Sequence, residues 1–300
     1  IELRAKLDTT NVEWLNDAGI FIEKYQARYD DALKYFELGL NQSIVEYGEG
    51  SKWATTLYNN VGHTYSSKGD YSRAMEYYNK ALLIQENLLD GDRYVATSYM
   101  NIGKLYDVQG DYNLAMEYYH KSLSIFKEIY GNQHPNVANC YHNIGSALFS
   151  LGNYTQALEY FQSALDIYTK ADIIDQQGIA LVYNGIGEIY DKQGDYNEAL
   201  EYFKKSLSIK VKIFGEKHPS VAVSYNNIGH IYLSQKDYNK ALEYCLKSLA
   251  IRKNLLGTDH PDVATAYNNL GMIYFYLTDY DKAVAEAEAK IPAIKASLGI

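Results

Sequence analysis

Asparagine recurs in register along this chain, at one position of a repeated segment. The residues concerned are Asn60, Asn101, Asn143, Asn227 and Asn269, and Asn184 lies one place before the corresponding position. A carboxamide donates through its N–H groups and accepts through its oxygen, so it can bond a peptide main chain without reading side chains. A row of such groups indicates recognition of a backbone rather than bond-making chemistry.

Motifs for catalysis or metal binding are missing from the sequence. It contains no P-loop, no Gly-x-Ser-x-Gly nucleophile motif and no paired metal-ligand spacing. His134, His218 and His260 occupy one position of separate segments, each before a proline, which favours a structural role at helix starts over metal binding. We therefore expect a protein that is not an enzyme and that uses no cofactor or metal.

The segments that carry the asparagines repeat with a period of 41 or 42 residues. Gly229 has counterparts at Gly62, Gly103, Gly145, Gly187 and Gly271, and Ala241 belongs to a parallel alanine series. A fixed period in this range is the signature of a solenoid. Seven units follow, with a degenerate first and an atypical last one, at about residues 12–45, 54–90, 95–131, 137–171, 179–213, 221–255 and 263–300.

Each unit is predicted to form two helices. Residues 225–232 place Tyr, Ile, Gly and Tyr at i, i+3, i+4 and i+7, and Asp237 follows as a cap for the second helix. A glycine inside a helix costs about 1 kcal/mol relative to alanine. Its recurrence at Gly229 therefore predicts a close helix crossing, for which we expect the small residues Ala241 and Ser248 as neighbours.

The pattern Tyr-x2-Ile-Gly-x2-Tyr followed by Ala-x3-Cys, within residues 225–245, resembles the tetratricopeptide repeat. The longer period and the His-Pro pairs at residues 134–135, 218–219 and 260–261 resemble the repeats of kinesin light chains. The resemblance implies an all-α fold, a right-handed α-solenoid of helix-turn-helix units that forms one superhelix over residues 1–300. It also implies that the first helix of each unit lines a concave groove.

The predicted binding face is the side of each first helix opposite its apolar stripe. At 100° per residue, the asparagine position and its neighbours one turn away point into the implied groove. The predicted peptide-binding residues are Asn60, His63, Asn101, Lys104, Asn139, Asn143, Ser146, Asn184, Asn227, His230, Asn269 and Tyr276.

Composition narrows the choice of partner. The net charge of −9 argues against nucleic acid as the main partner, because phosphate binding needs a basic surface. No apolar run approaches 18 residues, so we expect no membrane span. The two cysteines, Cys140 and Cys245, are interpreted as small buried hydrophobes, and the expected compartment is the cytoplasm.

Two functional interpretations follow from these features. The first is a non-catalytic scaffold that binds an extended peptide segment of a partner protein in the groove. The second is a sensor or regulatory array from a larger multidomain protein, which controls an attached effector or NTPase module. A structural alternative for the asparagines is that they bond to neighbouring helices. Separately, the scarcity of Lys and Arg in the groove disfavours a strongly acidic ligand.

Overall fold

The computed structural model describes residue 6 and residues 8–26, 28–85, 92–170, 175–257 and 261–277. These ranges hold thirteen α-helices and no strand, so the fold is an all-α solenoid. The helices are α2 (Val12–Gln26), α3 (Tyr29–Tyr47), α4 (Lys52–Ser67), α5 (Tyr71–Gln85), α6 (Asp92–Val108), α7 (Tyr112–Tyr130), α8 (Pro135–Ser150), α9 (Tyr154–Lys170), α10 (Gln176–Gln193), α11 (Tyr196–Phe214), α12 (Pro219–Ser234), α13 (Tyr238–Leu256) and α14 (Pro261–Tyr276).

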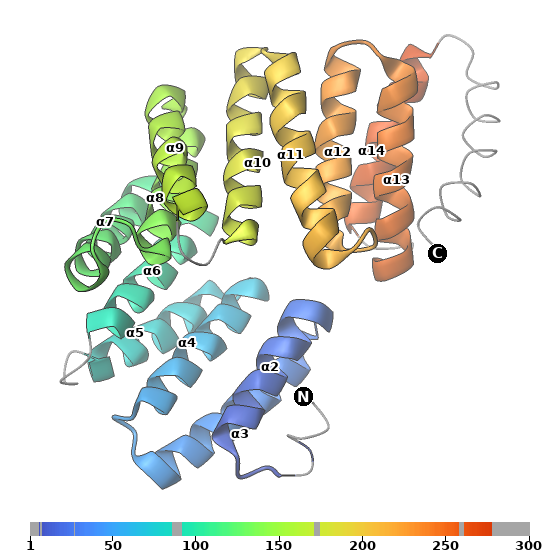
Figure 1. The fold of residues 1–300 in the computed structure, drawn as a ribbon. Helices are drawn as coiled ribbons and strands as arrows, with labels where there is room; N and C mark the ends of the chain where they lie inside the picture. The colour runs from blue at the N-terminus through green and yellow to red at the C-terminus, as the bar shows by residue number, and fades with distance from the viewer. Residues whose placement is uncertain are drawn as a thin grey trace. The chain divides into compact units, whose positions relative to one another are not determined.

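The chain divides into two compact units, residues 1–160 and 161–300. In the first unit α2 packs on α3, α4 on α5 and α6 on α7, and α3–α4, α5–α6 and α7–α8 contacts join successive pairs (Figure 1). In the second unit α10 packs on α11 and α12 on α13, with α11–α12 and α13–α14 contacts between pairs (Figure 1). The apolar core of each unit lies between the first and second helices of these pairs.

A left-handed residue ends the first helix of most pairs. Gly69, Gly110, Gly152 and Gly194 have φ between +80° and +84°, a region that costs glycine nothing because it has no Cβ. In the pair α12/α13 this place is taken by Lys236, with φ of 63°. The turn geometry is therefore kept in a repeat that has lost the glycine.

The first-helix glycines Gly62, Gly103, Gly187 and Gly229 mark close helix crossings, as predicted, and Ala241 lies beside Gly229, as expected. A Cβ on Gly103 would lie 2.6 Å from ring carbons of Tyr119. A Cβ on Gly229 would lie 2.8 Å from the Sγ of Cys245 and 3.4 Å from the carbonyl oxygen of Ala241. The prediction of Ser248 as a neighbour is wrong, because its hydroxyl instead donates to the Ala222 carbonyl at 2.8 Å. Most of these glycines make room for a large ring rather than for a small residue.

The tyrosines pack on one another in a repeated arrangement. Tyr77 lies between Tyr65 at 5.6 Å and Tyr58 at 6.1 Å, and the Lys80 ammonium lies 5.0 Å from its ring centre. The same arrangement recurs as Tyr99, Tyr106 and Tyr118 with Lys121, as Tyr183, Tyr190 and Tyr202 with Lys205, and as Tyr225, Tyr232 and Tyr244 with Lys247. Offset aromatic contacts and cation–π attraction account for the high tyrosine content.

Two of the three His-Pro pairs start helices, as predicted. His134 and His218 have extended backbones, and the Nδ1 of each accepts a hydrogen bond from the N–H two residues on, at 3.1 and 3.2 Å. Each ring also stacks on the preceding aromatic residue, Tyr130 at 4.1 Å and Phe214 at 4.4 Å. His260 and the predicted second helix of the last unit lie outside the described residues.

Candidate functional site

All twelve residues of the predicted binding face lie on the first helix of a pair. They are Asn60 and His63 on α4, Asn101 and Lys104 on α6, Asn139, Asn143 and Ser146 on α8, Asn184 on α10, Asn227 and His230 on α12, and Asn269 and Tyr276 on α14. None of them belongs to the buried core. The repeat therefore places them at equivalent positions of the first helices within each compact unit.

In the first unit the asparagines bond from one repeat to the previous one. The Nδ2 of Asn60 donates to the Oδ1 of Asn16 at 2.7 Å. The Nδ2 of Asn101 donates to the Oδ1 of Asn59 at 3.2 Å, and the Ser98 hydroxyl donates to the same oxygen at 3.2 Å. Successive first helices are thus joined by carboxamides.

The second unit shows the same connection. The Nδ2 of Asn227 donates to the Oδ1 of Asn184 at 3.2 Å, and that of Asn269 donates to the Oδ1 of Asn226 at 2.8 Å. Asn184 uses its own Nδ2 to donate to the Glu188 carboxylate at 2.6 Å. The contacts of Asn227 and Asn269 run from each asparagine to the preceding first helix, as do those of Asn60 and Asn101 in the first unit.

These bonds confirm the structural alternative for four asparagines and leave half of each carboxamide uncommitted. The Oδ1 atoms of Asn60, Asn101, Asn227 and Asn269 accept no hydrogen bond from the residues that the structure describes, and all four side chains are half-buried. Asn143 differs, since its Oδ1 lies 3.4 Å from the Nδ1 of His142. A carboxamide held through its nitrogen presents its oxygen in a defined direction.

The bonding partners Asn16, Asn59 and Asn226 were missed in the sequence. The signal for two of them was present, because Asn59-Asn60 and Asn226-Asn227 are doublets at equivalent places in the repeat. The helical projection placed only the second member of each doublet in the groove. A side chain that reaches the next helix does not follow from the period of one helix.

Ionisable groups on this face also connect repeats. The Nδ1 of His63 lies 2.9 Å from the Oε1 of Glu23, and the Nδ1 of His230 lies 3.7 Å from the Oδ2 of Asp191. The exposed Lys104 has no anionic partner among the described residues, and partial desolvation by neighbouring groups lowers its pKa. The face therefore combines paired and unpaired charges of both signs.

The second unit also holds a half-buried carboxylate, Glu188, and a buried ammonium, Lys210. Burial raises the pKa of Glu188, and the hydrogen bond from Asn184 opposes that shift. Lys210 on α11 is 6% exposed, its Nζ donates to the Ser224 hydroxyl at 3.1 Å, and burial lowers its pKa. In both groups burial makes the charged form less favourable than it is in water.

Groups suited to bond-making chemistry are not gathered here. Burial raises the pKa of Cys140 to about 11 and that of Cys245 to about 12, which favours the protonated thiol in both residues. Within the described ranges, no three His, Cys, Asp or Glu side chains come together as metal ligands. The arrangement can offer hydrogen bonds and local charge to a ligand.

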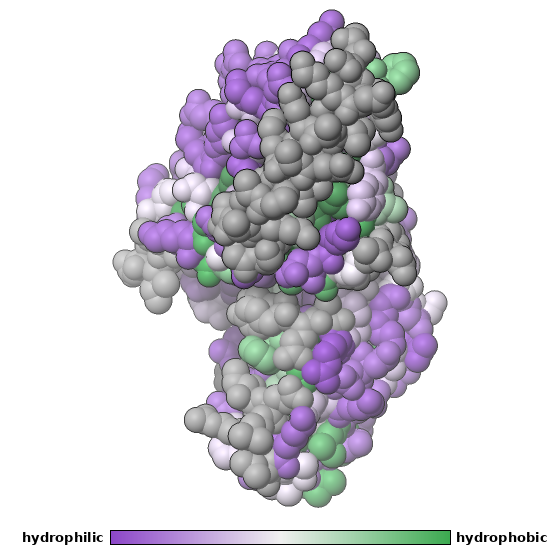
Figure 2. Space-filling model, turned by 90° about the vertical axis from the view of Figure 1, so that its right-hand side faces the viewer, coloured by the Kyte–Doolittle hydropathy of each residue, from purple (hydrophilic) through white to green (hydrophobic). Residues whose placement is uncertain are grey.

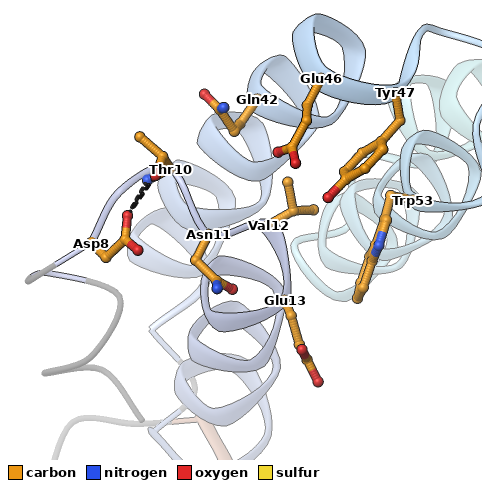
Figure 3. A pocket seen from close by; sticks show the side chains of 9 residues that line it. All are labelled: Asp8, Thr10, Asn11, Val12, Glu13, Gln42, Glu46, Tyr47 and Trp53. Atoms are coloured by element: carbon orange, nitrogen blue, oxygen red, sulfur yellow. Dashed lines mark hydrogen bonds between the residues drawn. The ribbon is translucent and has the colours of Figure 1, made fainter.

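A separate polar cavity of about 480 Å³ lies at the start of the chain (Figure 3). Its lining residues are Asp8, Thr10, Asn11, Val12, Glu13, Gln42, Glu46, Tyr47 and Trp53. Asp8 accepts from the backbone N–H and the hydroxyl of Thr10, at 2.9 and 2.6 Å, and these bonds lower its pKa. The Asp8 carboxylate therefore has a hydrogen-bond partner within the chain, whereas Glu13 and Glu46 are exposed to solvent.

The described surface seen in Figure 2 is mostly hydrophilic, with hydrophobic residues in separate patches. Among the helices described, none is both long enough and apolar enough to cross a membrane.

Comparison with known proteins identifies the repeat. A family model described as tetratricopeptide repeat matches residues 13–87, 94–170, 178–254 and 220–289. A second model with the same description matches residues 142–212. No curated protein sequence matches the chain.

Solved structures with related folds share little sequence with the chain. BtubC (BKLC) from P. vanneervenii is 22% identical with a TM-score of 0.59, over 80% of this chain and 94% of that one. One chain in the crystal structure of the APC/C hetero-tetramer Cut9-Hcn1 is 18% identical with a TM-score of 0.64, over 90% of this chain and 44% of that one. The Podosopora anserina putative kinesin light chain with nearly identical TPR-like repeats is 19% identical with a TM-score of 0.54. The match covers 70% of this chain and 98% of that one. At such identities the likeness concerns the fold alone.

Proposed function

Since the chain belongs to the tetratricopeptide repeat family, we propose that it is a non-catalytic scaffold that binds an extended peptide segment of a partner protein. Proteins of this family commonly serve as interaction scaffolds. In each compact unit, the proposed site is the face formed by the half-buried asparagines of the first helices of that unit.

One observation carries this proposal. Asn60, Asn101, Asn227 and Asn269 are each fixed through Nδ2 by the preceding repeat, while Oδ1 stays without a partner in the described structure. An acceptor whose orientation is set before binding loses little conformational freedom when a ligand arrives. Main-chain N–H groups of an extended peptide are the matching donors.

The charges within each unit define the ligand further. In the first unit Lys104 lies on the first helix α6, and in the second unit the exposed Lys192 on α10 is accompanied by Glu188 and Asp191. A mixture of signs matches neither a strongly acidic segment nor a polyphosphate backbone, which call for clustered cations. The fitting ligand is a peptide of mixed or low charge.

The proposal is tested with a random peptide library displayed to the full chain. Peptides enriched by wild type are synthesised, and their affinities are measured by fluorescence anisotropy. The key variant is Asn60→Ala with Asn101→Ala, and the matched control is Asn16→Ala with Asn59→Ala, all within the first unit. Both pairs break the same two bonds between first helices, and Asn59→Ala also removes the bonds of Asn59 with Ser98 and Thr55. Only the first pair removes the unpartnered oxygens.

We expect the first variant to bind roughly tenfold or more weakly, because two lost hydrogen bonds of about 1 kcal/mol each exceed one decade in affinity. The control should retain affinity closer to wild type at a temperature where circular dichroism shows both variants folded. Equal losses in the two variants would mean that the asparagines act only on the structure. A library from which wild type enriches no peptide would overturn the proposed function itself.

A further inference from the structure

The polar cavity at the start of the chain carries an unbalanced negative charge. It is formed by residues at the start of α2, the end of α3 and the start of α4, and its volume is about 480 Å³. Its lining includes the carboxylates of Asp8, Glu13 and Glu46 and contains no Lys, Arg or His. Glu13 and Glu46 are exposed, and neither forms an ion pair within the residues that the structure describes. A concave surface of this charge attracts a cation.

Two aromatic rings line the same cavity. Tyr47 and Trp53 lie on one side of it, and Asp8 and Thr10 lie on the other (Figure 3). Tyr47 is 53% exposed, and a hydrogen bond with the Glu46 carboxylate raises the pKa of its hydroxyl. Ring faces and carboxylates together offer both kinds of contact that bind an organic cation in proteins.

The repeat does not require an indole at Trp53. This position, nine residues before the first-helix glycine Gly62, holds no constant residue type in the later units. The equivalent residues are Tyr94, Asn136, Gly178 and Ser220. Trp53 is partly buried against the core of the first unit, which fixes its ring at the edge of the cavity. A bound group therefore meets a ring whose position is already set.

The chain holds two of its own guanidinium groups with the same kinds of side chain. The Cζ of Arg73 lies 4.6 Å from the ring centre of Tyr65, and its Nε donates to the Asp70 carboxylate at 2.5 Å. The Cζ of Arg93 lies 4.5 Å from the ring centre of Tyr94, which is the equivalent of the indole in the next repeat. The cavity offers a ring and carboxylates in the same way, with no arginine among its lining residues.

We propose that this cavity binds a guanidinium group, which stacks on the Trp53 ring and donates hydrogen bonds to the carboxylates of Glu13 and Glu46. Guanidinium fits such a site better than ammonium, because it is planar, weakly hydrated and carries five N–H donors. Two sources supply this chemistry, namely a small guanidinium compound and an arginine side chain of a partner protein.

The indole N–H signals in the NMR spectrum of the full chain test the site. The chain has two tryptophans, and Trp14 does not line the cavity, so it serves as the internal reference for Trp53. Trp53→Phe assigns the two signals. The probes are ethylguanidinium, ethylammonium and the neutral ethylurea, which are similar in size and are compared at constant ionic strength.

We expect ethylguanidinium to shift the Trp53 signal in a saturable way, with the Trp14 signal unchanged and ethylurea without effect. Glu13→Gln with Glu46→Gln should weaken binding roughly threefold to tenfold, because two exposed charge contacts are lost. The matched control is Asp17→Asn with Glu37→Gln, which removes two exposed carboxylates of the same two helices outside the cavity. It should bind as wild type does.

A Trp53 signal that does not respond to ethylguanidinium, or that responds equally to ethylurea, would overturn the proposal. Equal affinity for ethylammonium would contradict the guanidinium assignment, and equal weakening in the control variant would attribute binding to overall charge instead of the cavity. The peptide acetyl-Gly-Arg-Gly-amide separates the two sources. Tighter binding of this peptide than of ethylguanidinium supports a partner's arginine, and equal affinity supports a small compound at the same site.

Discussion

The Nδ2 of Asn101 donates to the Oδ1 of Asn59 across 3.2 Å, although the two residues lie 42 positions apart. Asn59 is 7% exposed, accepts also from Ser98, and donates to the Thr55 carbonyl at 3.2 Å. One carboxamide therefore holds two consecutive first helices together, beside the face on which we place the ligand.

Replacing this carboxamide should destabilise the first unit. Asn59→Ala leaves the buried Ser98 hydroxyl and the Asn101 amide without a partner, which should cost about 1–3 kcal/mol in free energy of unfolding. Urea denaturation followed by circular dichroism measures the change. Asn79→Ala, on the exposed side of α5, is the matched control and should fall within about 0.5 kcal/mol of wild type.

Adding one methyl group at a helix crossing should also destabilise the fold. Gly103→Ala gains about 1 kcal/mol in helix propensity, but its Cβ would lie 2.6 Å from the Tyr119 ring, and such overpacking costs about 1–3 kcal/mol. We expect a net loss in thermal unfolding. Combining it with Tyr119→Leu should relieve the clash, and purely additive losses in the double variant would show that the ring is not the cause.

His142 should make stability depend on pH. Burial lowers its pKa to about 4 from an ordinary 6.5, with Lys104 acting in the same direction and the bond to Asn143 opposing it. Between pH 4 and 6.5 the unfolded chain binds more protons than the folded one. The free energy of unfolding therefore rises with pH across this window, by at most about 3 kcal/mol, and this contribution is lost as pH falls towards 4.

The variant His142→Asn isolates this dependence, because asparagine occupies the equivalent position at Asn184 and Asn226. Urea denaturation at several pH values from 4 to 7 should give a shallower slope for the variant. A slope equal to that of wild type would assign the dependence to other groups.

The His-Pro start of α12 should contribute both a cap and a ring contact. His218→Ala removes the Nδ1 acceptor and the stack on Phe214 at 4.4 Å, so we expect a loss of about 1–2 kcal/mol in thermal stability. His218→Asn keeps a capping acceptor and should recover about half of this loss. If both variants were equally destabilised, the ring contact would be the sole contribution.

The repeated architecture could be predicted because its signals are local and occur several times. Gly62, Gly103, Gly187 and Gly229 recur at a constant period, and each marks a helix crossing that the structure confirms. Capping acids such as Asp237 and left-handed glycines such as Gly194 act within a few residues of themselves. Features of this kind depend on backbone geometry that a single segment already specifies.

The asparagine row shows where such reasoning ends. The sequence alone determined the repeat, the helix pairs, the family pattern and the side of each first helix on which asparagine recurs. Only the tertiary structure decided that Asn101 donates through its nitrogen to Asn59 while its oxygen accepts no bond within the described residues, and that the crossing glycines Gly62, Gly103 and Gly187 face rings. Hydrogen bonds and close packing between helices depend on how far and at what angle two repeats approach, and the periodicity of one helix contains neither quantity.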